Sequence, residues 1–387
     1  MVDILLDQTE KNKSKAIGIL GMHRSGTSAL ARAVNLAGAY LGEEGSLYGP
    51  LQDNPEGFWE RIDFNDFQER LLALLKRRWD IAMPIPERVW NGPEIAPYKN
   101  ELLDLVRQNF AGQPLWAWKD PRSCILLPLW KQVLEELGTD FVCIMAVRNP
   151  LDVARSLQKR NNFPISKSLG IWLEYTLAIL REVRGIPTTV LFYDDLLEKG
   201  SEEIRRCFDD LALPWQMTEE SQGELERFLR PDLRHSKTGK SLPEEKFGPV
   251  ARIYNALGDI SGGQTDLLSA LPEDIRSIDD NFKLYAGYFE PDVEDAVALA
   301  EKVSLQDKEL SARDRQLSAK DQQLIARDQQ LSAKVRQISE LRNSVDEQAT
   351  EINRLKNHLH EMENSMSWKI TRPLRSVGRA LIPPKKQ

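Results

Sequence analysis

The sequence predicts an α/β protein in which a P-loop-like parallel sheet flanked by helices precedes a long C-terminal helical coiled coil. Between residues 16 and 290, short apolar runs alternate with amphipathic stretches, as in a layered βα domain. Within residues 300–366, apolar residues recur every seven positions, as in a coiled coil. We expect residues 1–15 to form a flexible polar tail and residues 367–387 a basic amphipathic tail.

Four apolar runs predict the buried parallel strands, at residues 16–20, 115–118, 141–147 and 188–193. An apolar helical face follows the first run, and Gly38 supplies its stop. After the third run, Asn149 can cap a helix that Pro150 opens. Open α/β sheets bind ligands just past the carboxyl ends of their strands, where the polar residues Lys119, Asp120, Arg148, Tyr193 and Asp194 fall.

The first predicted strand leads into the loop GMHRSGTS, residues 21–28, which is nearly a Walker-type phosphate loop. Gly21 and Gly26 have the Walker spacing, but Thr27 occupies the place of the lysine. Backbone N–H groups and the helix dipole favour an anion at such a turn, and Arg24 lies within it. We expect the whole loop to bind a ligand, through the residues Gly21, His23, Arg24, Ser25, Gly26, Thr27 and Ser28.

This loop and a later motif resemble the donor-binding motifs of sulfotransferases that use 3′-phosphoadenosine-5′-phosphosulfate, especially the bacterial members. The family loop has a basic residue followed by Ser-Gly-Thr, which Arg24 to Thr27 match. In AVRNPLDVARSL, Arg148 and Ser156 match the family's arginine and serine for the 3′-phosphate. The resemblance covers residues 16 to about 240, and further similar segments lie at residues 53–60, 116–130, 191–198 and 228–237.

The resemblance implies transfer of a sulfuryl group from this donor to a hydroxyl or amine, with no metal ion. Arg24 and Lys119 would stabilise the charge that develops during transfer, and Tyr193 would belong to the donor site. Arg122 would meet an anionic acceptor, with Asp120 and Asp194 orienting the nearby cations. Two further candidates for the 3′-phosphate or the acceptor are Arg234 and Lys237.

The acceptor also needs a general base, which in this family is a histidine or a glutamate. Glu60 is the first choice because it ends the family-like segment 53–60. Glu44 is the second choice because related Golgi enzymes place a glutamate at nearly this distance from the loop. His23, next to Arg24, is the third, and its alternative role is to pack beneath the loop.

Residues 335–366 carry two apolar seams and predict a parallel coiled-coil homodimer. The a positions are β-branched or leucine, and the d positions are apolar except for Gln348, which helps to fix the register. In the preceding repeats the d positions are Arg313, Lys320, Arg327 and Lys334. A solvated helix with one apolar stripe and a tight dimer are both compatible with that part of the pattern.

The sequence of the C-terminal tail bears on the acceptor and on the location of the protein. Its segment SMSWKITRPLR resembles a motif of bacterial glycosyltransferases in surface-polysaccharide assembly, which points to a glycan acceptor. Residues 365–387 contain six cations and no acid, so they either lie on an anionic membrane surface or form a basic end without contacts.

Composition limits the location and the partners of the chain. The 387 residues are 41% hydrophobic and carry a net charge of −7, which argues against nucleic acid as a partner. The three scattered cysteines favour buried thiols in a reducing compartment over a disulfide framework or a metal cluster. We find no signal peptide and no apolar run of about eighteen residues. We therefore expect a cytoplasmic protein, at the inner face of the membrane if its tail binds there.

Two other functions are compatible with parts of the sequence. A P-loop kinase or NTPase would share the fold, but Thr27 at the lysine position counts against it. A catalytically inactive scaffold would recruit partners through the coiled coil, but the presence of both Arg24 and Arg148 counts against it.

Overall fold

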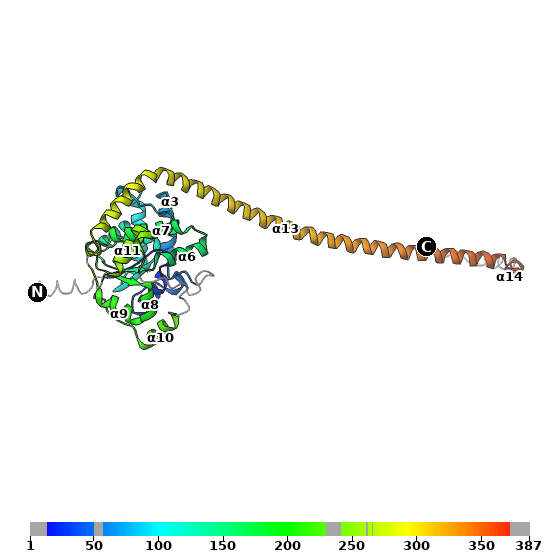
Figure 1. Ribbon diagram of the computed structural model, residues 1–387. Helices are drawn as coiled ribbons and strands as arrows, with labels where there is room; N and C mark the ends of the chain where they lie inside the picture. Colours follow the sequence, from blue (N-terminus) through cyan, green and yellow to red (C-terminus); the bar gives the residue numbers. More distant parts are fainter. Residues whose placement is uncertain (1–13, 50–56, 230–240, 261, 265, 372–387) are drawn as a thin grey trace. The chain divides into compact units, whose positions relative to one another are not determined.

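A computed structural model describes residues 14–49, 57–229, 241–260, 262–264 and 266–371 (Figure 1). It divides the chain into two compact units, Met1–Ala300 and Glu301–Gln387. The described residues of the first unit form one sheet of four parallel strands in the order β2-β1-β3-β4. The predicted α/β fold class is therefore confirmed, and the four predicted runs form the strands β1 (Lys15–Leu20), β2 (Leu115–Lys119), β3 (Asp140–Val147) and β4 (Thr188–Phe192).

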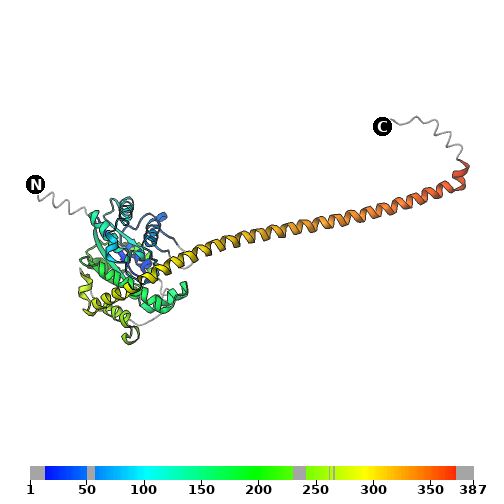
Figure 2. The same ribbon diagram turned by 90° about the horizontal axis from the view of Figure 1, so that it is seen from above.

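Helices lie on both faces of the sheet (Figure 1 and Figure 2). Successive strand residues point to opposite faces, so each strand contributes to two separate apolar cores. One core holds α3 (Ile62–Leu74), α4 (Ala96–Phe110), α5 (Leu127–Glu136), α6 (Pro150–Asn161), α7 (Ile165–Glu182), α11 (Glu244–Gly258) and α12 (Leu267–Ala270). The other holds α2 (Thr27–Leu36), α8 (Tyr193–Lys199), α9 (Ser201–Asp210) and α10 (Glu219–Phe228).

Local sequence sets several helix ends as predicted. The side chain of Asn149 accepts a hydrogen bond from the N–H of Leu151, and Pro150 is the first residue of α6. Gly38, with φ of 113°, follows the end of α2. Tyr193 differs from the prediction, because it begins α8 instead of ending β4. Two aspartates in the first turn of α8 favour this helix start.

The connections that the structure describes include the short 3₁₀ helices η1 (Glu44–Ser46), η2 (Glu87–Asn91) and η3 (Pro121–Cys124). The long helix α13 (Asp274–Asn364) begins within the range predicted for the α/β domain and runs through both units, and α14 (Met366–Ile370) follows it. Its side chains described from residue 302 onward are exposed. The helix ends before Met366, the last residue of the predicted seam, and the pairing of two chains stays a prediction. No helix in the described ranges has an apolar stretch long enough to cross a lipid bilayer.

Candidate functional site

The loop between β1 and α2 packs tightly against its neighbours. Arg24 and Gly26 adopt left-handed backbone conformations, with φ of 71° and 84°. A Cβ atom on Gly26 would lie 2.1 Å from Cδ2 of Tyr193, and one on Gly21 would lie 2.6 Å from the carbonyl oxygen of Ala146. Close packing therefore requires glycine at both positions. Gly26 is also the N-cap of α2 and adds no side-chain hydrogen bond to the first turn of the helix.

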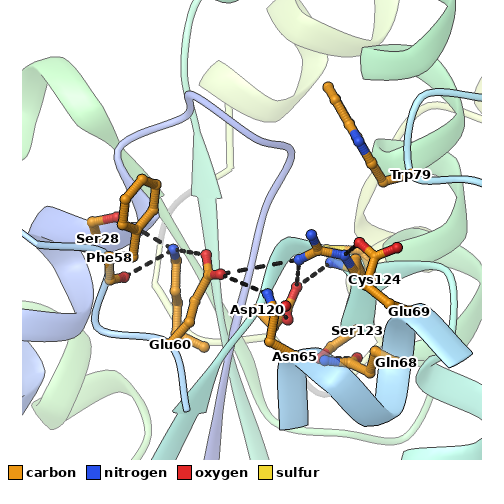
Figure 3. Close-up of polar contacts among 12 residues, drawn as sticks. Ser28, Phe58, Glu60, Asn65, Gln68, Glu69, Trp79, Asp120, Ser123 and Cys124 are labelled. Carbon is orange, nitrogen blue, oxygen red and sulfur yellow. Dashed lines mark hydrogen bonds and ion pairs between the residues drawn. The ribbon is translucent and has the colours of Figure 1, made fainter. Parts of the chain in front are cut away.

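Lys119, the last residue of β2, brings a cation to this loop from the neighbouring strand. Its Nζ lies 3.2 Å from Oγ of Ser28, 3.1 Å from the carbonyl oxygen of Phe58 and 2.5 Å from Oε1 of Glu60. Figure 3 shows Ser28, Phe58 and Glu60 converging on this point. Because β2 pairs with β1, its carboxyl end lies beside the loop. Lys119 thus brings a lysine from β2 to the start of α2, where the loop itself has Thr27 in the lysine position.

Glu60 is buried among basic groups. Its carboxylate contacts Lys119, accepts a hydrogen bond from Nδ2 of Asn65 at 3.2 Å, and lies 4.0 Å from Nη1 of Arg122. Burial raises the pKa of Glu60, whereas the charge of Lys119 opposes this rise. The first-choice base is therefore placed beside the loop. The side chain of Glu44, the second choice, lies outside the described residues.

A second basic cluster joins the two predicted donor motifs. Nε of Arg24 donates to Oγ of Ser156 at 2.8 Å, and Nη1 of Arg148 donates to the carbonyl oxygen of Arg24 at 3.0 Å. The guanidinium of Arg148 lies over the ring of Tyr193, 4.6 Å from its centroid. Arg24 thus points toward the residue predicted to hold the 3′-phosphate. The structure brings these four side chains together from the loop, the residue that follows β3, α6 and α8.

Two polar atoms at the loop lack partners. His23 packs against Trp79 and Tyr175, with ring centroids 4.6 Å and 5.9 Å away. Burial, followed by the nearby positive charges of which Arg122 is the strongest, holds the pKa of His23 well below its usual range. The imidazole is therefore neutral at pH 7. Its Nε2 and the Oγ of Ser25 are buried without a hydrogen-bond partner in the described part of the chain.

These groups surround a pocket of about 160 Å³ at the carboxyl edge of the sheet. Its lining includes one carboxylate, Glu60, and four basic side chains, Arg24, Lys119, Arg148 and Arg160. This excess of positive charge suits an anion. Its volume is smaller than the roughly 300–1,000 Å³ of sites that hold a whole drug-sized ligand. Sequence reasoning missed Arg160, although it lies one helical turn after Ser156 and shares its face of α6.

Other predicted residues lie apart from this pocket or beyond the description. Arg122 pairs with two carboxylates, at 2.5 Å from Glu69 and 3.0 Å from Asp120 (Figure 3). Asp120 thus contacts one of the nearby cations, while its orienting role and the contact of Arg122 with an acceptor stay predictions. Arg234 and Lys237 lie outside the described residues. Within the ranges that the structure describes, no group of three or more His, Cys, Asp or Glu side chains is arranged to hold a metal ion.

No protein-family profile matches the sequence, and no curated protein matches it. The solved structures that are similar to the chain include two sulfotransferases. The sulfotransferase domain of the Synechococcus PCC 7002 olefin synthase is 20% identical, with a TM-score of 0.32, and the match covers 70% of this chain and 95% of that domain. Sulfotransferase STF1 from Mycobacterium tuberculosis H37Rv is 10% identical, also with a TM-score of 0.32, over 58% of this chain and 73% of that one. Similarity at this level assigns neither a family nor an activity to the chain.

Proposed function

We propose that this protein is a sulfotransferase that moves a sulfuryl group from 3′-phosphoadenosine-5′-phosphosulfate to a hydroxyl or an amine. The observation that carries the proposal is the pairing of two basic clusters at one sheet edge. Lys119 lies at the start of α2, where a 5′-phosphosulfate would bind. Arg24, Arg148 and Ser156 form the other cluster, where a 3′-phosphate would bind.

The groups present fit this donor on three further counts. The pocket is lined by four basic side chains and one acidic one, which suits a donor with several negative charges. The Oγ of Ser25 is buried and unsatisfied in the described structure, so it has a hydrogen bond to offer at the loop. Gly26 leaves the N-terminus of α2 open to an anion.

In the proposed reaction, the acceptor oxygen or nitrogen attacks sulfur in line. The new bond to sulfur forms while the bond from sulfur to the bridging oxygen of the 5′-phosphate breaks. Lys119 lies between Glu60 and Ser28, so it can turn from the carboxylate toward the bridging oxygen as negative charge builds there. Glu60, released from this contact, takes the proton of the acceptor. Neutral His23, with its unpaired Nε2, is the other proton acceptor at the pocket.

Phosphoryl transfer from a nucleoside triphosphate is the second candidate, and Lys119 is the observation that favours it. A lysine that reaches the loop from β2 supplies the cation that Thr27 does not. Nucleotide kinases, however, hold Mg²⁺ with side-chain oxygens and need no 3′-phosphate site. Dependence on Mg²⁺ therefore distinguishes the two functions.

The test is a transfer assay with full-length protein and glycan and lipid extracts of the source organism. We expect label from a sulfur-labelled donor to enter an acceptor in the presence of a chelator. Arg148→Ala should greatly reduce this transfer, whereas Arg155→Ala, on the exposed side of α6, should not. Incorporation of the γ-phosphate of ATP, dependent on Mg²⁺ and without sulfur transfer, would establish the kinase function instead.

The remaining parts of the proposal concern partners and place. The proposed acceptor is a surface-polysaccharide glycan, and this assignment rests on the tail motif alone. Two chains pair through residues 335–366 in parallel, and their basic tails act together on the anionic inner face of the membrane. Residues 372–387, which carry most of the charge of this tail, lie outside the described residues.

A further inference from the structure

A second cavity, of about 340 Å³, lies in the same unit as the loop pocket and shares no lining residue with it. It is enclosed by the segment that leads into η2, by α7, and by the first turns of α13. One of its lining residues, Cys124 at the end of η3, accepts a hydrogen bond through its Sγ from the N–H of Gly21 at 3.2 Å, so the cavity reaches toward the loop. The two cavities are therefore distinguished by their lining residues.

The lining of this cavity has an apolar and a charged part. The apolar part includes Ile85, Trp90, Ile125 and Ala178. The charged part centres on Glu174, a glutamate of α7 that is only 1% exposed. A lining of this composition suits a ligand with a hydrocarbon body and one polar end.

The carboxylate of Glu174 uses one of its two oxygens in a hydrogen bond with the described part of the protein. Its Oε2 accepts a hydrogen bond from Nη2 of Arg181 at 2.8 Å. No other donor contacts its carboxylate within the described ranges, so Oε1 has no protein partner there. Arg181 is shared, because its Nε donates to Asp279 at 2.9 Å, and Asp279 also pairs with Lys283 at 3.1 Å. One guanidinium thus serves two buried carboxylates.

The carboxyl group of Glu174 is harder to ionise than an exposed one. Burial raises the pKa of Glu174 to about 7, although the positive charge of Arg181 opposes this rise. Its cationic partner, Arg181, is shared with Asp279, so a cation at Oε1 would further stabilise the ionised carboxylate. The other charged groups of the cavity and its partners are Arg181 and Glu182 on α7, Lys131 on α5, Asp279 and Lys283 on α13, and Glu87 and Arg88 on η2.

We propose that this cavity is a second ligand site, which binds a small amphipathic amine. The ammonium group donates to Oε1 of Glu174, and the hydrocarbon part packs against Trp90 and its apolar neighbours. An ammonium group supplies Oε1 with both a hydrogen bond and a positive charge, whereas a neutral alcohol supplies only the hydrogen bond.

The test measures binding of hexylamine and of hexan-1-ol to the full-length protein by ligand-observed NMR, up to millimolar concentration. We expect hexylamine to bind at least about tenfold more tightly than the alcohol, as for a charge-assisted hydrogen bond. Its affinity should rise about tenfold between about pH 6 and pH 8, because Glu174 ionises while the amine stays protonated. Binding of the alcohol should not rise.

Variants locate the site. Glu174→Gln should remove most of the preference for the amine and its pH dependence, and Ala178→Leu should weaken both probes by filling the cavity. Glu203→Gln is the matched control, because Glu203 is a buried glutamate paired with Arg206 on α9, outside the cavity lining. Absence of saturable amine binding, or equal binding of amine and alcohol at every pH, would overturn the proposal even if Glu174→Gln did not fold.

Discussion

Breaking the buried pair of Lys119 and Glu60 should destabilise the α/β unit strongly. Their side chains are only 2% and 8% exposed. Glu60→Gln leaves the ammonium group of Lys119 buried without a carboxylate, which typically costs about 3–5 kcal/mol. Lys119→Met should cost less, because Glu60 keeps Arg122 at 4.0 Å and the hydrogen bond from Asn65.

The double variant Glu60→Gln with Lys119→Met separates the pair from its surroundings. It leaves no member of the pair charged, so its loss of stability should fall short of the sum of the single losses by about 1–3 kcal/mol. Lys99→Met serves as control, because Lys99 pairs with Glu136 at the surface and such pairs contribute less than about 1 kcal/mol.

The measurement is urea unfolding of the full-length protein, followed by tryptophan fluorescence. Trp368 is the only tryptophan beyond residue 300, so the signal reports mainly on the α/β unit. Additive losses in the double variant would show that the two groups do not interact. Single losses below about 1 kcal/mol would show that the pair is solvated, and the proposed exchange of Lys119 between Glu60 and the donor would then lose its basis.

Three more predictions address other parts of the molecule. Arg24→Ala should raise the KM for the donor about tenfold or more with little change in urea midpoint, because Arg24 belongs to the cluster proposed to hold the 3′-phosphate; a lower urea midpoint with an unchanged KM would assign Arg24 a structural role. The pKa of Glu174 is about 7 in the folded state and about 4.5 in the unfolded state. The protonated side chain therefore contributes to the free energy of unfolding, and this contribution should be lost as pH rises between these two values. Stability should fall by about 3 kcal/mol over this range, and a curve for Glu174→Gln as steep as the wild-type curve would contradict the assignment. Light scattering should find a dimer for the full chain and a monomer for a truncation after residue 300, and a monomeric full chain at micromolar concentration would refute the coiled coil.

The sheet and the loop could be predicted because their signals are local. Four apolar runs stand out from their neighbours and form the four strands. Gly21 and Gly26 show their spacing directly in the sequence. The run predicted for β4 extends one residue too far, to Tyr193. The two aspartates that follow favour the start of a helix, and this outweighs the strand preference of Tyr193.

Much of the site could not be predicted, because it depends on strand order and helix packing. The contact of Lys119 with Ser28 requires β2 to lie beside β1, which no local pattern specifies. The rings of Trp79 and Tyr175 reach His23 from distant segments. In the sequence, Glu174 looks like an ordinary polar residue of a helix. Its burial depends on tertiary packing, in which Asp279 of α13 contacts Arg181, the partner of Glu174.

Calorimetric binding of adenosine 3′,5′-bisphosphate, AMP and ATP tests the central claim most directly, since it needs no knowledge of the acceptor. Arg148 and Ser156 should recognise the 3′-phosphate, so we expect the bisphosphate to bind more tightly than AMP or ATP. Arg148→Ala should remove most of the preference over AMP, at a cost of about 2 kcal/mol for a charge-assisted contact. Arg155→Ala should retain the preference. Tighter binding of ATP than of the bisphosphate by the wild-type protein would contradict the sulfotransferase proposal.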